Sequence, residues 1–231
     1  MLDDPGHAVP TPFFIPAPPS RELTVKASKK PVIAAECDRT IDIYTKAAQI
    51  FHEQGFDATS MSNIAAAVDL TKAGLYYYIE SKEDLLFAIM NYAMERLETM
   101  VIEPSREFDD PEQRLRSIIE RHGRLLTEGN KAITILTDEI EGLKPKHRKQ
   151  ILDRKRVYFD FVRGTLDALR AEKKLRDVNT TVATFGLFGT LLWLPRWFRA
   201  EGRLTSEDVI SQIANIALSG LLTTSCEAQP A

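Results

Sequence analysis

Apolar residues recur at three- and four-residue spacing through almost the whole chain after residue 35. Ile41, Tyr44, Ala48 and Phe51 form the first series, and comparable series continue to about residue 222. This period places side chains on one face of an α-helix, whereas a half-buried strand would alternate apolar and polar residues. We therefore expect an all-α fold of nine helices, four short or closely coupled ones followed by five longer ones.

Residues that favour helix ends divide this pattern into segments. We expect Gly55, Pro104 and Asn130 to end helices, because glycine and asparagine tolerate a left-handed backbone and proline lacks an N–H donor. Ser81 and Ser206 are expected N-caps. The resulting helices span about residues 36–54, 61–68, 72–78, 82–101, 111–129, 132–142, 147–175, 178–199 and 206–222.

The first 34 residues differ from the rest of the chain. They carry seven of the twelve prolines and no helical period, which is typical of a disordered or loosely ordered arm. The last part of this arm, RELTVKASKK, is basic. A short tail, residues 226–231, is expected at the other end.

Several features predict a cytoplasmic protein without a membrane partner. Cys37 and Cys226 lie near opposite ends without signs of secretion, which favours free thiols over a disulfide. The acidic, proline-interrupted start does not resemble a signal peptide. Eighteen uncharged residues follow Asp177, but they include Asn179 and four threonines. A buried helix is therefore favoured over a membrane span.

The segment TSMSNIAAAVDLTKAGLYYYI, residues 59–79, predicts two short helices joined by a tight turn. Ile64 and Val68 are apolar on the first helix, and Leu75 and Ile79 are apolar on the second. Asp69 lies in the turn, where an unusual backbone conformation is needed and aspartate is tolerated. This is a helix-turn-helix arrangement.

Angular positions on the second helix separate the three consecutive tyrosines. Thr71 is the expected N-cap, so Lys72 begins the turn that would enter a major groove. Tyr76 and Tyr77 fall off the core face, and Tyr78 lies at its edge. Plain packing remains the alternative role for each ring.

About 50 contiguous residues resemble the DNA-binding domain of the TetR family of bacterial transcriptional repressors. Asp69 replaces the usual glycine of the turn, and Gly74 replaces a threonine or larger residue. The second departure shifts the expected recognition towards neighbouring side chains. The residues that carry the resemblance are Phe51, Gly55, Phe56, Thr59, Ile64, Ala65, Leu70, Thr71, Leu75, Tyr76, Ser81, Lys82 and Leu85.

The resemblance implies a dimer that binds a palindromic double-stranded DNA operator and is released by a small-molecule inducer. It divides the chain into a helix-turn-helix domain of three helices, residues 35–82, and a helical ligand-binding and dimerisation domain, residues 83–225. Lys72 and Tyr77 are then the best candidates for base contacts. The full expected DNA-binding set is Thr59, Ser62, Thr71, Lys72, Ala73, Gly74, Tyr76, Tyr77, Tyr78 and Lys82, with phosphate contacts from Thr59, Ser62, Tyr76, Tyr78 and Lys82.

The net charge of the predicted DNA-binding domain does not favour DNA binding. Residues 36–100 hold five basic and eleven acidic side chains, which is a poor balance for attracting phosphate. We hypothesise that the basic end of the arm supplies phosphate contacts that offset this charge.

The segment LFGTLLWLPRWFRAEGRLTSEDVI resembles the branch of the family that responds to acyl-coenzyme A thioesters. Trp193 and Trp197 share a helix face, and Arg196 is suited to a phosphate or carboxylate. The alternative is that the tryptophans seal the dimer or the core and the arginines are solvated. The expected ligand-binding residues are His122, Tyr158, Phe159, Arg163, Trp193, Arg196 and Trp197, with packing as the alternative for the first four. The expected dimer-interface residues are Gly186, Gly189, Ile213, Ala217 and Gly220, with an ordinary core within one chain as the alternative.

An enzyme is the competing class, and the sequence does not support it. The four histidines share no metal-ligand spacing, and neither a phosphate-binding glycine loop nor a nucleophile elbow is found. We expect no catalytic residue, metal ion or cofactor. An activator or a constitutive DNA-binding protein of the same fold remains the alternative to a repressor.

Overall fold

The structure is a computed structural model that describes residues 30–129 and 131–223. When α4, η1 and α5 are taken as one continuous rod and η2 is taken with α7, these residues form the nine predicted helices. They contain no strand beyond an isolated bridge between Leu175 and Leu222. The segments are α1 (Lys30–Gln54), α2 (Met61–Ala67), α3 (Lys72–Tyr78), α4 (Lys82–Leu97), the π-helix η1 (Glu98–Ile102), α5 (Glu103–Arg106), α6 (Pro111–Thr127), α7 (Ala132–Asp138), the 3₁₀ helix η2 (Ile140–Gly142), α8 (Pro145–Ala171), α9 (Thr180–Trp197) and α10 (Ser206–Leu221).

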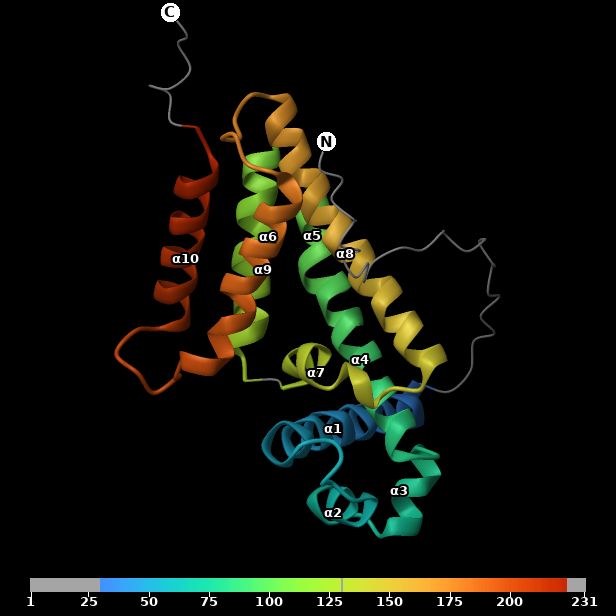
Figure 1. Cartoon of the computed structure of the whole chain (residues 1–231). Helices are drawn as coiled ribbons and strands as arrows, with labels where there is room; N and C mark the ends of the chain where they lie inside the picture. Colours follow the sequence, from blue (N-terminus) through green and yellow to red (C-terminus); the bar gives the residue numbers. More distant parts are fainter. Residues whose placement is uncertain (1–29, 130, 224–231) are drawn as a thin grey trace, which may run out of the picture.

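Helices α1, α2 and α3 gather at one end of the molecule, and α4 leads from them into the larger helical half (Figure 1). There α6, α8, α9 and α10 pack together, while α7 lies across the junction and contacts both α1 and α4. One hydrophobic cluster runs through both halves. It includes Phe51 and Leu75 near α3, Leu86 and Met90 on α4, and Leu115 on α6. The DNA-binding end and the larger half are therefore joined by packed core rather than by a loose linker.

Several predicted helix ends are confirmed. Gly55 follows α1 with φ of 81°, a left-handed conformation that ends the helix. The hydroxyl of Ser81 accepts a hydrogen bond from the backbone N–H of Asp84, so Ser81 is the N-cap of α4. Thr71 caps α3 in the same way.

Two predicted helix ends are wrong. Pro104 does not stop the helical rod. It is the second residue of α5, directly after the π-helix η1, and the backbone stays helical through Ile102 and Glu103. Ser206 is not the N-cap of α10. Thr205 is, and its hydroxyl accepts from the backbone N–H of Asp208 while that carboxylate accepts from the backbone N–H of Thr205, a complete capping box.

The boundary predicted for the arm also shifts. Helix α1 begins at Lys30, so residues 30–34 belong to it rather than to the arm. Residues 1–29, Asn130 and the tail at 226–231 lie outside the described residues, and the roles predicted for them stay predictions.

Candidate DNA-binding surface and ligand cavity

The turn between α2 and α3 has the backbone that the sequence predicts. Asp69 has φ of 53°, in the left-handed region, and the backbone N–H of Leu70 donates to Ala65 at 2.9 Å. A guanidinium N–H of Arg39 donates to the carbonyl of Val68. These contacts hold α3 at a defined angle to α2 and α1.

The first turn of α3 is exposed and tightly capped. Thr71 Oγ1 accepts from the N–H of Gly74 at 3.0 Å, and a Cβ added at Gly74 would lie 3.2 Å from that oxygen. Glycine therefore lets the capping hydroxyl approach closely. Thr71, Lys72 and Ala73 all face solvent, which leaves this turn accessible to a groove.

The three tyrosines point in the directions that the helical period predicts. Leu75 is fully buried, whereas Tyr76 and Tyr77 are 44% and 78% exposed. Tyr78 is half-buried against the core and meets the Tyr77 ring edge-to-face at 5.3 Å between centroids. The outward orientation of two rings and the edge position of the third are confirmed, while their contacts with DNA stay predictions.

Two residues predicted to hold phosphate near α2 differ in accessibility. Ser62 is exposed, whereas Thr59 is buried, with its hydroxyl donating to the carbonyl of Gly55 at 2.8 Å and its N–H donating to Phe56. Because both donors are engaged within the protein, the structure argues against a phosphate contact by Thr59. The N-cap of α2 is Ser60, which accepts from the N–H of Asn63 at 3.1 Å.

Lys82 is engaged within the DNA-binding domain. Its ammonium donates to the carbonyls of Phe56, Asp57 and Thr59 at 2.8, 3.3 and 3.0 Å, and it lies 4.3 Å from the centroid of the Phe56 ring. These bonds tie the start of α4 to the loop before α2. A phosphate contact by Lys82, as predicted, would compete with them.

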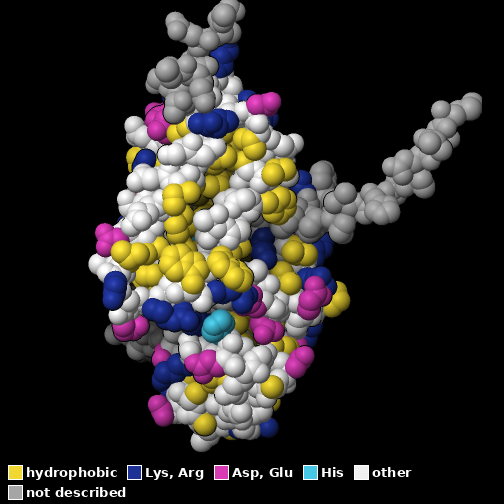
Figure 2. Space-filling model, turned by 60° about the vertical axis from the view of Figure 1, so that its left-hand side comes forward, with side chains coloured by type: hydrophobic (Ala, Val, Ile, Leu, Met, Phe, Trp, Pro, Cys, Tyr) yellow, Lys and Arg dark blue, Asp and Glu magenta, His cyan; other side chains and the backbone are white. Residues whose placement is uncertain are grey.

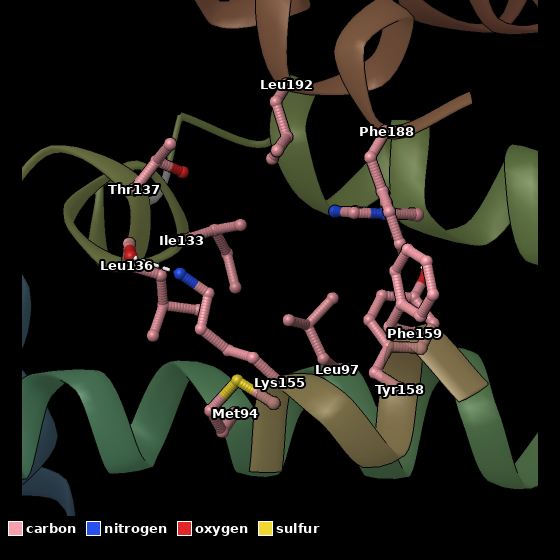
Figure 3. A pocket seen from close by; sticks show the side chains of 11 residues that line it. Met94, Leu97, Ile133, Leu136, Thr137, Lys155, Tyr158, Phe159, Phe188 and Leu192 are labelled. Carbon is pink, nitrogen blue, oxygen red and sulfur yellow. Dashed lines mark hydrogen bonds between the residues drawn. The ribbon is translucent and has the colours of Figure 1, made fainter. Parts of the chain in front are cut away.

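A cavity of about 110 Å³ lies inside the larger half, between α4, α6, α7, α8 and α9. Figure 3 shows aliphatic and aromatic side chains converging on it, with the Lys155 ammonium and Thr137 on the α7 side. Three predicted ligand-binding residues, His122, Tyr158 and Phe159, line it. The complete lining is Met94, Leu97, His122, Ile133, Leu136, Thr137, Lys155, Tyr158, Phe159, Phe188 and Leu192.

The polar groups of this cavity are few and mostly paired. The Tyr158 hydroxyl lies 3.0 Å from His122 Nδ1, while His122 Nε2 has no hydrogen-bond partner among the described residues. Burial lowers the pKa of His122 to about 4 and raises the pKa of Tyr158. At neutral pH the side chain of His122 is therefore uncharged. Burial also lowers the pKa of Lys155, whose ammonium donates to the carbonyl of Leu136 at 2.9 Å.

A second pocket, of about 240 Å³, lies beside the cavity and shares Thr137 and Leu192 with it. Its outer wall includes Trp193 and Arg196. The Arg196 guanidinium lies 5.2 Å from the Trp193 ring centroid and 3.3 Å from the carboxylate of Asp138. Two predicted ligand-binding side chains thus meet at this outer pocket.

Two other predicted ligand residues are not in either lining. Arg163 pairs with Asp160 one turn earlier on α8, at 3.0 Å. Trp197 is 47% exposed at the last residue of α9. The sequence reasoning also missed Lys155, which stands in a charged run that looks solvated, and Phe188, which lies in a helix that is apolar on most sides.

Helix α7 and the residues after it connect the cavity to the DNA-binding end, beside α4, which lines the cavity with Met94 and Leu97. Helix α7 contributes Leu136 and Thr137 to the cavity, and Glu139, which follows it, accepts a hydrogen bond from the backbone N–H of Phe56 at 3.3 Å. A Cβ at Gly142 would lie only 2.8 Å from the Phe56 ring. A displacement of α7 would therefore be felt directly at the loop between α1 and α2.

Exposed apolar side chains gather on α9 and α10. They include Val182, Phe185 and Trp193 on α9, at 64%, 51% and 60%, and Ile216 on α10, at 72%. Figure 2 shows hydrophobic side chains collected on the side of the molecule that α10 occupies in Figure 1. Of the predicted interface residues, Gly186, Gly189 and Gly220 are open, since an added Cβ would meet nothing within 4 Å, and Ile213 and Ala217 are half-buried against the core.

In the part of the chain that the structure describes, no helix has the length and apolar character needed to cross a bilayer. The protein therefore has two domains. One is the helix-turn-helix domain, and the other is the larger helical half that contains the cavity and is joined to the first through α7 and η2.

Comparison with known proteins agrees with this architecture. Residues 43–89 match the model of bacterial regulatory proteins of the tetR family, and residues 109–221 match the model of tetracyclin repressor-like C-terminal domains. A crystal structure of AibR in complex with isovaleryl coenzyme A and operator DNA is 37% identical, covers 79% of this chain and 97% of its own, and has a TM-score of 0.72. A TetR/AcrR-family regulator from Thermobifida fusca YX-ER1 is 32% identical, covers 79% of this chain and 98% of its own, and has a TM-score of 0.61.

A curated relative extends the same pattern. The HTH-type transcriptional repressor KstR2 of Rhodococcus jostii (strain RHA1) is 26% identical over 185 residues, which are 79% of this chain and 91% of the relative. The chain belongs to the TetR family of bacterial regulatory proteins, which are transcriptional regulators rather than enzymes.

Proposed function

We propose that the protein is a homodimeric transcriptional repressor that binds a palindromic DNA operator in the cytoplasm and is released by an acyl-coenzyme A thioester. The observation that carries this proposal is the segment α7–η2. It forms a wall of the cavity and also contacts Phe56 in the DNA-binding domain. The crystal structure of AibR holds isovaleryl coenzyme A and operator DNA in one complex, which supports a regulator with a site for each. The release of the operator by the ligand is our proposal.

On the DNA side, α3 is the recognition helix. Its exposed first turn and the outward ring of Tyr77 suit it to the major groove, with Lys72 and Tyr77 reading base edges. Tyr76, Tyr78 and Ser62 are the candidate phosphate contacts. Two such helices about 34 Å apart in a dimer would read successive major grooves.

On the dimer side, α9 and α10 would pack against the same helices of a second copy as a four-helix bundle. The exposed Phe185 and Ile216 supply apolar area, and the open Gly186 and Gly220 permit close helix approach. Gly189 is open as well and lies where this face meets the outer pocket, whose lining includes it. Such an arrangement fixes the distance between the two recognition helices.

Ligand binding would change that distance by favouring one of two arrangements. A ligand shifts the population only if it binds the two states with different affinity. Filling the cavity pushes on Leu136 and Thr137, and Glu139 and Gly142 transmit the displacement to Phe56. The conformer that binds ligand best then has the wrong spacing for the operator.

Fluorescence anisotropy of a labelled operator duplex, selected from a random library, tests the proposal. Isovaleryl coenzyme A should lower operator affinity at least tenfold, while free coenzyme A should leave it unchanged. An operator affinity unaffected by any acyl-coenzyme A would leave a constitutive DNA-binding protein. Deleting the gene in a reporter strain separates repressor from activator, because expression should rise for the former and fall for the latter.

A further inference from the structure

We infer that the cavity and the outer pocket are two parts of one ligand site that selects thioesters of short acyl groups. The inner cavity takes an acyl chain of about four or five carbons, its carbonyl accepts from His122 Nε2–H, and the outer pocket takes the anionic remainder of the thioester at Arg196 and Trp193. This inference rests on the proposed function, since it names which thioesters the regulator senses.

The size of the cavity sets the limit on chain length. Its volume is about 110 Å³, and a dry apolar cavity of about 150 Å³ accommodates benzene, a six-carbon molecule. Close packing of the surrounding core leaves little room for growth. Long fatty acyl chains are therefore excluded, whereas a small branched or straight chain fills the space.

His122 supplies the polar contact for the acyl carbonyl. Its side chain is buried, lines the cavity and has an Nε2 without a partner among the described residues. The Tyr158 hydroxyl lies 3.0 Å from His122 Nδ1, and we assign the phenol as the donor, which places the proton of the neutral ring on Nε2. A buried donor without a partner is costly, which makes it a ready contact for a ligand oxygen.

The outer pocket has the chemistry for the rest of a coenzyme A thioester. Arg196 is exposed and pairs with Asp138 at the rim, and Trp193 offers a 60% exposed aromatic face beside it. A guanidinium suits phosphate, and an indole suits a stacked base. Leu192 and Thr137 line both the cavity and the outer pocket, so the thioester would pass between these two side chains, with its acyl group on one side and its coenzyme A portion on the other.

Isothermal titration calorimetry with full-length protein and no DNA tests acyl selectivity. Each added CH₂ from acetyl to butyryl coenzyme A should tighten binding about fourfold. Isovaleryl coenzyme A should bind tightly, and octanoyl and palmitoyl coenzyme A should bind at least tenfold more weakly than butyryl. Palmitoyl coenzyme A that binds as tightly as butyryl would overturn the size limit.

Variants separate the two ends of the site. Arg196→Gln should weaken isovaleryl coenzyme A about tenfold but leave the N-acetylcysteamine thioester of isovalerate unchanged, because that probe carries the acyl group without phosphates. Arg163→Gln, on α8 outside both linings, is the matched control and should change neither. An Arg196 variant that weakens both probes equally would contradict the assignment of the outer pocket.

His122→Phe should weaken both probes about fivefold to tenfold, and His122→Gln, which retains an N–H donor, should restore part of the loss. Thermal unfolding checks that each variant is folded. If His122→Phe does not fold, the ligand affinity of His122→Gln is compared with that of wild type instead. Unchanged affinity in both variants would overturn the role of His122. If the protein binds short-chain thioesters selectively but they do not release the operator, the proposed function is wrong and this inference stands. If thioesters of every chain length release the operator, this inference is wrong and the proposed function stands.

Discussion

Replacing Tyr77 with alanine tests whether the exposed ring reads DNA or packs. The ring is 78% exposed, and the one ring contact described for it is the edge-to-face contact with Tyr78. An exposed aromatic pair of this kind stabilises by about 0.5 kcal/mol. For a chain of this size, that corresponds to a fall in Tm of about 1–2 °C.

The expected loss in DNA binding is much larger. A base contact contributes about 1–3 kcal/mol of discrimination, and a dimer makes it twice. The Tyr77→Ala variant should therefore lose at least about thirtyfold in affinity for its selected operator. Binding to a scrambled duplex of the same length should change little, because phosphate contacts dominate there.

Anisotropy titrations of both duplexes at one salt concentration, together with thermal unfolding, measure these quantities. Leu75→Ala is the matched comparison on the same helix. Since Leu75 is fully buried, that change should cost about 2–5 kcal/mol of stability. A loss of more than about 5 °C in Tyr77→Ala, or equal losses on both duplexes, would refute the assignment of the ring to base reading.

Lys82, Glu139 and His122 can be tested in the same way. Lys82→Met should destabilise the protein by about 1–3 kcal/mol in urea unfolding, because three carbonyls lose their donor; a salt slope of operator binding that falls while stability is unchanged would assign Lys82 to phosphate instead. Glu139→Ala, which removes the acceptor of the Phe56 N–H, should bind isovaleryl coenzyme A normally yet show a smaller ligand effect on operator affinity, and an unchanged effect would remove Glu139 from the coupling. The folded pKa of His122 lies below its ordinary value of 6.5, at about 4, so its stabilising contribution is complete above pH 6.5 and is lost as the pH falls towards 4. Wild type should lose about 3 kcal/mol more than His122→Gln over that range, and parallel pH profiles would contradict the buried neutral ring.

Local chemistry explains what the sequence predicted well. The helical period separates Leu75 from Tyr76 and Tyr77, because angles along a short helix depend only on spacing. The left-handed Asp69 and the capping hydroxyl of Thr71 follow from residue preferences within one turn. The N-cap of α10 was within reach of the same reasoning, since Asp208 follows Thr205 by three residues, the spacing of a capping box.

Contacts between distant segments explain what the sequence did not predict. The ammonium of Lys82 bonds carbonyls more than twenty residues earlier, and Tyr158 meets His122 across 36 positions. Lys155 stands among charged residues in the sequence, which suggests a solvated side chain, but its ammonium donates to the carbonyl of Leu136 in the wall of the cavity. Pairings of this kind depend on how helices cross, and apolar spacing within each helix does not determine that crossing.

In the proposed mechanism, binding of the ligand to the protein weakens binding of the operator, and binding of the operator weakens binding of the ligand. Thermodynamic linkage requires that operator weaken ligand binding by the same factor by which ligand weakens operator binding. The most direct measurement is the Kd of isovaleryl coenzyme A with and without a saturating operator duplex. We expect ligand binding to be at least tenfold weaker on the operator, by the same factor as the loss of operator affinity at saturating ligand. The same Kd in both states would contradict it.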